Sequence, residues 1–367
     1  MKSFVPSLLK ERNSRSIYNL FSDGNAYSKA DISRLTGISA PTVIKVIDSF
    51  IEKGILLNAG EGESVVGRKP TLLVLNTRAY YAIGVDFQNG KVRAGLVDLE
   101  GTVIDVLEKP LQREFREILL HDVCEMIYEL RTQNVLDVSS VLGVGLGLPG
   151  VVDCEKNTVE YAYSIGMNEK TDCTELISEF NQASGLPVYI DNDINAAAIG
   201  EFKARKLTKA EDLLYISLGT GLGAGIVLNG KLRHGIHYFA GEIAYTSFDE
   251  DYVSKNSSIG WLERRISDGD AVNRAVKRFE GTENYIGKIS KTLALTIANF
   301  SVLLDFDQVV IGGLLSEHFG KEILVEIEKN LKKMSLFKIN CDLARSALPE
   351  LTGSAIIVYE HRLKDIL

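Results

Sequence analysis

The sequence has few cysteines, no long apolar run and no low-complexity tract. Its four cysteines, at positions 124, 154, 173 and 341, lack the close pairing of a disulfide framework or a zinc ribbon, so each is expected to be a reduced thiol. The longest apolar run, residues 141–152, is broken by glycines and too short to span a bilayer. Residues 1–13 lack the apolar core of a signal peptide. We therefore expect a cytoplasmic protein without a membrane partner.

Length and charge indicate several domains, one of which is basic. The chain has 367 residues, more than one core usually supports, and its 45% apolar content is ordinary for a globular protein. The net charge is −8, but residues 1–78 contain eleven Lys or Arg against seven Asp or Glu. The remainder contains thirty against forty-two. Only the N-terminal segment therefore suits a nucleic-acid backbone.

Residues 28–53 have the pattern of two short helices joined at a glycine. Ser28 is a typical N-cap with Asp31 as its capping-box partner, and Gly37 ends this first helix. Ser39 caps a second helix that has Pro41 in its first turn. Apolar residues then recur at helical spacing, at Val43, Val46, Ile47 and Phe50. This arrangement predicts a helix-turn-helix.

The predicted DNA contacts come from the second helix and from a wing. The N-terminal residues of a recognition helix meet base edges, which selects Ser39, Ala40, Thr42 and Lys45. Apolar residues 55–57 and 72–75 flank a glycine-rich bend and predict a two-stranded wing with Arg68 and Lys69 at its tip. A small helical adaptor with a solvated basic face is the alternative. Charge and motif together favour DNA binding.

Beyond residues 76–78, the expected linker, the pattern changes to an α/β body. Apolar strands alternate with amphipathic stretches, which predicts helices packed on sheets. The expected strands are residues 81–87, 91–98, 141–148, 188–190, 213–218 and 309–311.

Several segments of this body, in this order, resemble the ROK family of repressors and sugar kinases. Residues 148–153 (LPGVVD) are similar to its Pro-Gly loop and residues 191–198 (DNDINAAA) to its Asn-Asp segment. Residues 217–225 resemble its second phosphate loop, and residues 240–242 and 311–313 its later glycine turns. The Gly-Arg-Lys-Pro wing, residues 67–70, is similar to that of the xylose-repressor and N-acetylglucosamine-repressor branch.

The resemblance implies an α/β protein with a winged helix-turn-helix followed by a two-lobed, actin-like body. The winged helix-turn-helix would cover residues 1–77 and the first lobe residues 78–190, to which a C-terminal helix over about 352–367 returns. Residues 191–351 would form the second lobe, with the sugar site in the cleft and the dimerisation surface.

Two departures from the family pattern oppose kinase activity. Where the kinases carry Asp-x-Gly-Gly-Thr against the phosphates of ATP, this chain has Asp86-Phe87-Gln88-Asn89-Gly90, and Asn89-Gly90 is typical of a tight hairpin turn. Where the family builds a zinc site, Tyr245 replaces the histidine, and Ser254, Asn256 and Trp261 align with the cysteines. We therefore predict neither bound ATP nor bound zinc, and no other metal or cofactor.

The sugar-facing positions of the family are better kept. By resemblance, Asn192, Asp193, Glu242 and Glu263 would contact sugar hydroxyls, with Tyr245 in place of a contacting histidine. In a kinase Asp193 would be the general base. The alternative is that these polar residues are helix caps and loop residues. The glycines of residues 217–225 could simply preserve a turn. Neither His234 nor His237 is expected to have a metal partner.

These observations predict a transcriptional regulator, a repressor released from operator DNA by a sugar or sugar phosphate. It is expected to act as a homodimer, with a tetramer left open. One alternative is an ATP-dependent sugar kinase that carries an additional DNA-binding domain. The other is a regulator of this family that responds to a protein partner instead of a sugar.

Overall fold

The computed structural model describes residues 6–61, 69–208, 210–219, 221–246, 282–306 and 308–367. They form two compact units. The first unit comprises the segment up to Leu146, Glu175–Tyr189 and Ser354–Leu367, and the second comprises Gly147–Thr174 and Ile190–Gly353. The boundaries of the three expected domains remain a prediction. In the described part of the chain, no helix is long and apolar enough to cross a membrane.

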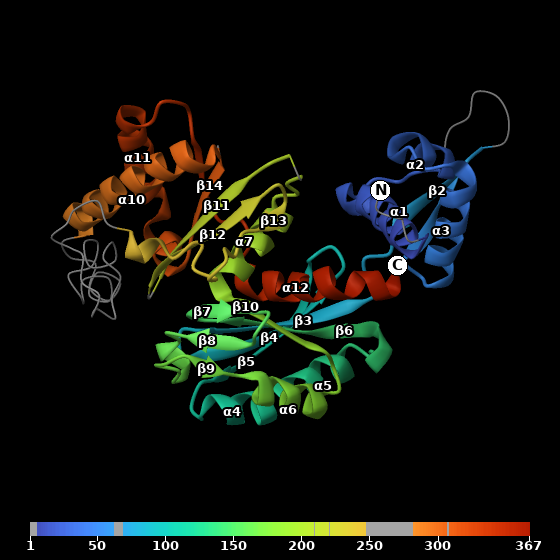
Figure 1. Cartoon of the computed structure of the whole chain (residues 1–367), viewed down its shortest axis with the longest axis horizontal. Helices are drawn as coiled ribbons and strands as arrows, with labels where there is room; N and C mark the ends of the chain where they lie inside the picture. The colour runs from blue at the N-terminus through green and yellow to red at the C-terminus, as the bar shows by residue number, and fades with distance from the viewer. Residues whose placement is uncertain (1–5, 62–68, 209, 220, 247–281, 307) are drawn as a thin grey trace. The chain divides into compact units, whose positions relative to one another are not determined.

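The N-terminal elements have the predicted helix-turn-helix order (Figure 1). They are α1 (Pro6–Leu20), η1 (Phe21–Asp23), α2 (Lys29–Thr36), α3 (Ala40–Glu52), β1 (Leu56–Glu61) and β2 (Thr71–Leu75). The capping box is confirmed, because the Asp31 N–H donates to Ser28 Oγ at 3.1 Å and the Ser28 N–H donates to Asp31 Oδ2 at 3.2 Å. Gly37 ends α2 with a φ of +69° that suits glycine. The strands β1 and β2 pair antiparallel, as predicted for a wing.

A small apolar core holds these helices together within the first unit. Phe50 of α3 is completely buried in it, among residues that include Ile17 and Phe21. Leu363, near the end of α12 (Pro349–Ile366), packs against the same core. Lys53, which follows α3, donates from Nζ to the Ile366 carbonyl at 2.9 Å. The end of the C-terminal helix therefore contacts the helix-turn-helix.

A five-stranded sheet of order β10-β6-β3-β4-β5 forms the body of the first unit, and the ends of β6 and β10 pass into the second unit. Its strands are β3 (Tyr81–Gln88), β4 (Lys91–Asp98), β5 (Val103–Pro110), β6 (Val141–Leu148) and β10 (Val188–Asn192). The helical segments are α4 (Phe115–Glu117), η2 (Ile118–Val123), α5 (Cys124–Gln133), η3 (Val138–Ser140) and α6 (Thr174–Ser184). Figure 1 shows α4, α5 and α6 on one face and α12 on the other. A Cβ at Gly145 would lie 1.8 Å from the Ser354 carbonyl oxygen, so only glycine allows α12 to pack this closely.

The second unit contains a five-stranded sheet of order β13-β12-β11-β14-β15 and a three-stranded sheet of order β7-β8-β9. The larger sheet contains β11 (Leu213–Leu218), β12 (Leu222–Leu228), β13 (Lys231–Leu232), β14 (Gln308–Gly312) and β15 (Asn340–Leu343). The smaller contains β7 (Val151–Asp153), β8 (Thr158–Glu160) and β9 (Thr171–Asp172). The helical segments are η4 (Tyr163–Ile165), α7 (Asp193–Ala204), η5 (Ile243–Tyr245), α10 (Thr282–Leu304) and α11 (Leu314–Met334). In Figure 1, α7 covers one face of the larger sheet, with α10 and α11 on the other. All six strands predicted for the body are confirmed, with ends within two residues.

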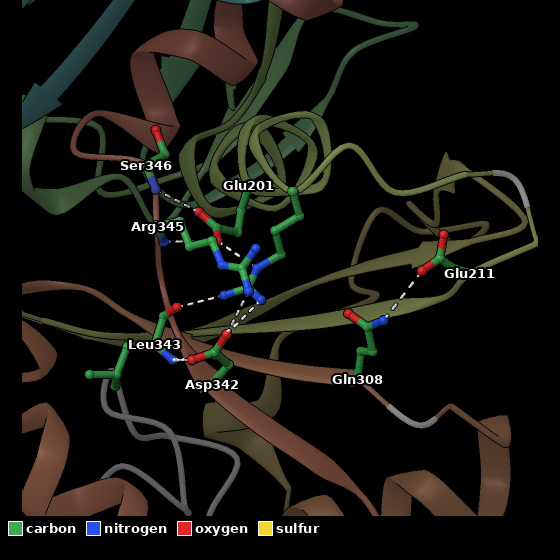
Figure 2. Close-up of polar contacts among 8 residues, drawn as sticks. Glu201, Glu211, Gln308, Asp342, Leu343, Arg345 and Ser346 are labelled. Carbon is green, nitrogen blue, oxygen red and sulfur yellow. Dashed lines mark hydrogen bonds and ion pairs between the residues drawn. The ribbon is translucent and has the colours of Figure 1, made fainter. Parts of the chain in front are cut away.

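A buried arginine connects α7 to β15 in the second unit (Figure 2). The side chain of Arg205 is only 5% exposed, and its Nε lies 2.7 Å from Oε1 of the fully buried Glu201. Its Nη1 lies 2.9 Å from Asp342 Oδ2, and its Nη2 donates to the Leu343 carbonyl at 2.6 Å. The guanidinium therefore has three acceptors on two elements that are far apart in the sequence.

Glu201 has further partners in the segment that follows β15 (Figure 2). Its Oε1 accepts from the Arg345 N–H at 2.9 Å, and its Oε2 accepts from the Ser346 N–H at 3.0 Å. One buried carboxylate thus binds a guanidinium and two backbone N–H groups, which offsets the cost of removing its charge from water.

Candidate functional site

The N-terminus of α3 presents three of the four predicted base-reading residues to solvent. Ser39, Ala40 and Lys45 are exposed, and Thr42 is half-buried. Ser39 occupies the N-cap position, as predicted, but its hydroxyl lies 2.9 Å from Thr42 Oγ1 and makes no capping bond to a backbone N–H. The opposite face of α3 is buried in the N-terminal core. The exposed face of the helix can therefore approach a ligand without disturbing that core.

The predicted wing is described in part. Five residue pairs join β1 and β2, from Leu56 with Leu75 to Glu61 with Thr71, with an irregularity between Asn58 and Gly60. Lys69 is exposed just before β2. Arg68 lies outside the described residues. The position of Lys69 beside the paired strands agrees with a cation near the tip of a wing.

Residues 86–90 form the predicted tight hairpin between β3 and β4. Asn89 and Gly90 have φ values of +53° and +72°, the left-handed conformations of a type I′ turn. Asp86 is fully buried, and its Oδ1 accepts from Arg93 Nε at 2.8 Å. Asp86 and Arg93 are also directly opposed in the β3–β4 register. The aspartate therefore has a structural partner in this fold.

Asn192 is the N-cap of α7. Its Oδ1 accepts from the N–H groups of Ile194 and Asn195, both at 2.9 Å. Its Nδ2 donates to the Gly150 carbonyl at 2.7 Å and lies 3.2 Å from Asp193 Oδ1. The half-buried side chain thus caps the helix and holds the Pro-Gly loop in place. The helix-cap alternative raised by the sequence describes Asn192 correctly, while its sugar contact stays a prediction.

The first turn of α7 and the segment of Glu242 contact the same strand, β12. A Cβ at Gly223 would lie 2.3 Å from Ile194 Cδ1, and one at Gly225 would lie 2.8 Å from the Ile194 carbonyl oxygen. A Cβ at Gly241 would lie 1.9 Å from a carbonyl oxygen of β12. These glycines are therefore needed for close packing of α7 and of the Gly241 segment against β12. The sequence pattern of Gly223 and Gly225 did not distinguish this packing role from phosphate binding.

The remaining predicted sugar contacts are only partly described. Asp193 and Glu242 are half-buried. Tyr245 ends η5 and packs against the apolar core of the second unit. Glu263 and the positions aligned with zinc ligands, Ser254, Asn256 and Trp261, lie outside the described residues. Asn192, Asp193, Glu242 and Tyr245 all belong to the second unit.

A cluster that the sequence analysis missed lies beside Asn192. Cys154, Asp191 and His234 bring their Sγ, carboxylate and ring-nitrogen atoms within 4.8 Å of one another. His234 Nε2 lies 2.7 Å from Asp191 Oδ2. Burial, together with the negative charge of Asp191, raises the pKa of the Cys154 thiol to about 11. Because the residues are separated by 37 and 43 positions, no short spacing could reveal them.

A cavity of about 280 Å³ lies in the same unit, between the small sheet and the loop after β13. Lys156, Lys170 and His237 line it together with carboxylates and apolar side chains. Lys156 Nζ is paired with Asp153 Oδ2 at 2.9 Å. The mixed polar and apolar lining is compatible with a small polar ligand.

The capping role of Asn192 predicts a stability effect that does not depend on sugar. Asn192→Ala should lower the free energy of unfolding by about 0.5 to 2 kcal/mol, because two N–H groups of α7 lose their acceptor. Asn192→Asp keeps the acceptor oxygen but loses the donor to the Gly150 carbonyl, so it should recover only part of this loss. Urea denaturation of both variants measures the difference. An alanine variant as stable as the parent chain would contradict the capping role.

Comparisons with known proteins agree with this architecture. The profile of the ROK family matches residues 82–344. A xylose repressor of Caldicellulosiruptor bescii is 29% identical over 361 residues, which cover 90% of this chain and 89% of the relative.

Two solved structures share the fold. One is a ROK family transcriptional regulator described as a homologue of the Escherichia coli MLC protein, with a TM-score of 0.77, 22% identity and 98% of both chains covered. The other is a ROK hexokinase of Thermus thermophilus, with a TM-score of 0.64, 21% identity, and 78% of this chain and 99% of the hexokinase covered. The predicted actin-like fold of the body is therefore confirmed.

Proposed function

This chain belongs to the ROK family, and we propose that it is a sugar-responsive transcriptional repressor that binds operator DNA. The observation that carries the proposal is the exposed N-terminal face of α3, presented by a capped helix-turn-helix on the same chain as a ROK body. An exposed DNA-recognition helix such as α3 is not required for the phosphorylation of a sugar.

The proposed DNA complex is a homodimer on a near-palindromic operator. Each α3 enters a major groove with Ser39, Ala40, Thr42 and Lys45 toward the base edges, and Arg68 and Lys69 of the wing neutralise phosphates. Two-fold symmetry of the dimer then matches the symmetry of the operator. Assembly of dimers into tetramers is compatible with the same DNA contacts. Operator binding requires that the protein act in the cytoplasm.

The proposed effector is a sugar or sugar phosphate held in the second unit by Asn192, Asp193, Glu242, Tyr245 and Glu263. Carboxylates and amides pair well with hydroxyl groups, and one unpaired polar group in a buried site costs about 1 to 3 kcal/mol. Because the Caldicellulosiruptor bescii relative is named a xylose repressor, xylose is the first sugar to test.

We further propose that the chain is not a sugar kinase. The sequence resemblance assigns the kinase phosphate loop to residues 86–90, where this chain has a type I′ turn at Asn89-Gly90 and an Asp86–Arg93 pair. Side chains at Gln88 and Asn89 would keep backbone N–H groups away from phosphates. Asp193 could act as a base only if a phosphoryl donor were bound nearby.

Sugar and operator binding are proposed to be coupled by about 1 to 3 kcal/mol, the usual range for allosteric proteins. A sugar that binds the DNA-incompetent state better will then weaken operator binding by roughly 5- to 150-fold. Thermodynamic reciprocity requires the operator to weaken sugar binding by the same factor.

Fluorescence anisotropy with DNA from upstream of the gene, at fixed salt, tests the proposal. We expect tight binding to this DNA, weak binding to a scrambled duplex, and release by one member of a panel of pentoses, hexoses, amino sugars and their phosphates. Specific binding without any sugar response would instead support a regulator controlled by a protein partner. Absence of specific binding with every ligand would reject the repressor, and measurement of ATP turnover would then test the kinase alternative.

A further inference from the structure

Three side chains with metal-binding chemistry meet away from the segment that aligns with the family's zinc site. Cys154 follows β7, Asp191 lies in β10, and His234 lies in the loop after β13. Their ligand atoms are within 4.8 Å of one another. All three residues belong to the second unit.

We propose that Cys154, Asp191 and His234 bind a divalent transition-metal ion, with Zn²⁺ as the preferred metal. A thiolate, an imidazole and a carboxylate are the three ligand types that zinc uses in proteins. Three protein ligands leave a fourth tetrahedral position for water or another small ligand. Hard cations such as Mg²⁺ and Ca²⁺ prefer all-oxygen sites and suit this donor set less well.

The surrounding residues orient the carboxylate of Asp191. It is buried, and its Oδ1 lies 3.1 Å from Asn195 Nδ2 and 2.7 Å from the Asn192 N–H. These two donors leave Oδ2 directed toward His234 Nε2. Metal-binding carboxylates usually have such second partners, which fix their orientation.

The backbones that carry the other two ligands are also held. The turn after β7 is closed by Asp153 Oδ1, which accepts from the Glu155 and Lys156 N–H groups at 3.2 and 3.0 Å. The loop after β13 is closed by a bond from the Ala240 N–H to the His234 carbonyl at 3.2 Å. These bonds hold the backbones of Cys154 and His234 in place independently of an ion.

A bound metal ion would connect three segments. Each of them contains a predicted sugar contact or lies next to a residue with that predicted role. Asp191 directly precedes Asn192, Cys154 follows the Pro-Gly loop, and the His234 loop leads into Glu242. The site is separate from the run around Tyr245, and it departs from the sequence-based expectation that the protein binds no metal. The metal site itself does not depend on the proposed repressor function.

The simpler alternative is a hydrogen-bonded Asp191–His234 pair beside a thiol, Cys154, that is hydrogen-bonded to the Tyr238 side chain. It accounts for the 2.7 Å distance between the two side chains. In this alternative the thiol keeps its bond to Tyr238 and binds no metal. The two possibilities differ in whether a bound metal acquires a sulfur ligand, which is directly measurable.

Cobalt substitution in the full chain tests the proposal. The protein is stripped with a chelator and titrated with Co²⁺ while its absorption is recorded. We expect one Co²⁺ per chain, with a thiolate-to-cobalt charge-transfer band that Zn²⁺ abolishes by displacement. Cys154→Ser should remove the band, and Cys341→Ser, the matched control at another half-buried cysteine, should leave it unchanged. All four cysteines of the chain are in the described residues, so each can be tested in turn.

A second variant tests the support for Asp191. Asn195→Ala removes the side-chain donor to Oδ1 and should weaken Zn²⁺ binding by about 10- to 100-fold in competition with a chromophoric chelator. Far-ultraviolet circular dichroism checks that each variant is folded. The proposal is wrong if the charge-transfer band does not form, if it survives Cys154→Ser, or if a folded Asn195→Ala chain binds Zn²⁺ as tightly as the parent.

Discussion

Replacing Arg205 with alanine is expected to lower the free energy of unfolding of the second unit by about 3 to 5 kcal/mol. The guanidinium is nearly inaccessible and pairs with Glu201 and Asp342 (Figure 2). Its removal would leave the fully buried Glu201 carboxylate without a compensating cation, which costs more than the pair contributes. Urea denaturation followed by circular dichroism measures the loss.

Arg345→Ala is the matched control, because Arg345 contacts the same Asp342 oxygen at 3.3 Å but its side chain is 61% exposed. An exposed pair of this kind contributes about 0 to 1 kcal/mol, so the control should differ little from the parent chain. If both variants lost the same free energy of unfolding, burial of the Arg205–Glu201 pair would not determine how much the pair contributes to stability.

Replacing both members of the pair should not restore full stability. Substituting Glu201 as well as Arg205 removes the unpaired charge, which recovers part of the loss. However, Glu201 also accepts the N–H groups of Arg345 and Ser346. In an apolar double variant such as Glu201→Leu with Arg205→Met, these two donors lose their acceptor. We therefore expect the double variant to lie between Arg205→Ala and the parent.

The elements that could be predicted from the sequence are those specified by neighbouring residues. The capping box of Ser28 and Asp31, the end of α2 at Gly37 and the turn at Asn89-Gly90 each depend on residues within a few positions. The six strands predicted for the body are apolar runs of strand length, and each was found. Other strands of the body, among them β5 and β12, were not predicted. These features are determined by residues that are close together in the chain, so they can be predicted from one sequence without an alignment.

The parts of the candidate site that could not be predicted depend on contacts between distant segments. From the sequence, Asn192 is predicted to contact sugar, with a helix cap as the alternative. Only the bonds to Ile194, Asn195 and Gly150 show that it caps. The grouping of Cys154 with His234 depends on how β7 and the loop after β13 are placed around Asp191. Such juxtapositions are set by tertiary packing, which leaves no periodic signal in the sequence.

The second large effect is expected at Phe50, where alanine should lower the stability of the helix-turn-helix by about 3 to 5 kcal/mol. The ring is completely buried in the small N-terminal core, and few other large side chains could fill the resulting cavity. A domain with such a small core has a small free energy of unfolding, so the loss of one large side chain is a large part of it. We expect operator affinity to be lost, together with hydrogen-exchange protection of α2 and α3.

Ile51→Ala is the control, because Ile51 lies on the same helix and is 45% exposed. It should bind the operator and exchange its amide hydrogens much like the parent, whereas Phe50→Ala should exchange more than about 100-fold faster in α3. Sugar binding, which we place in the second unit, should survive in both variants. Unchanged protection and affinity in Phe50→Ala would mean that α3 is not held by this core. Loss of operator binding in Ile51→Ala with protection intact would instead place that exposed side chain in the DNA interface.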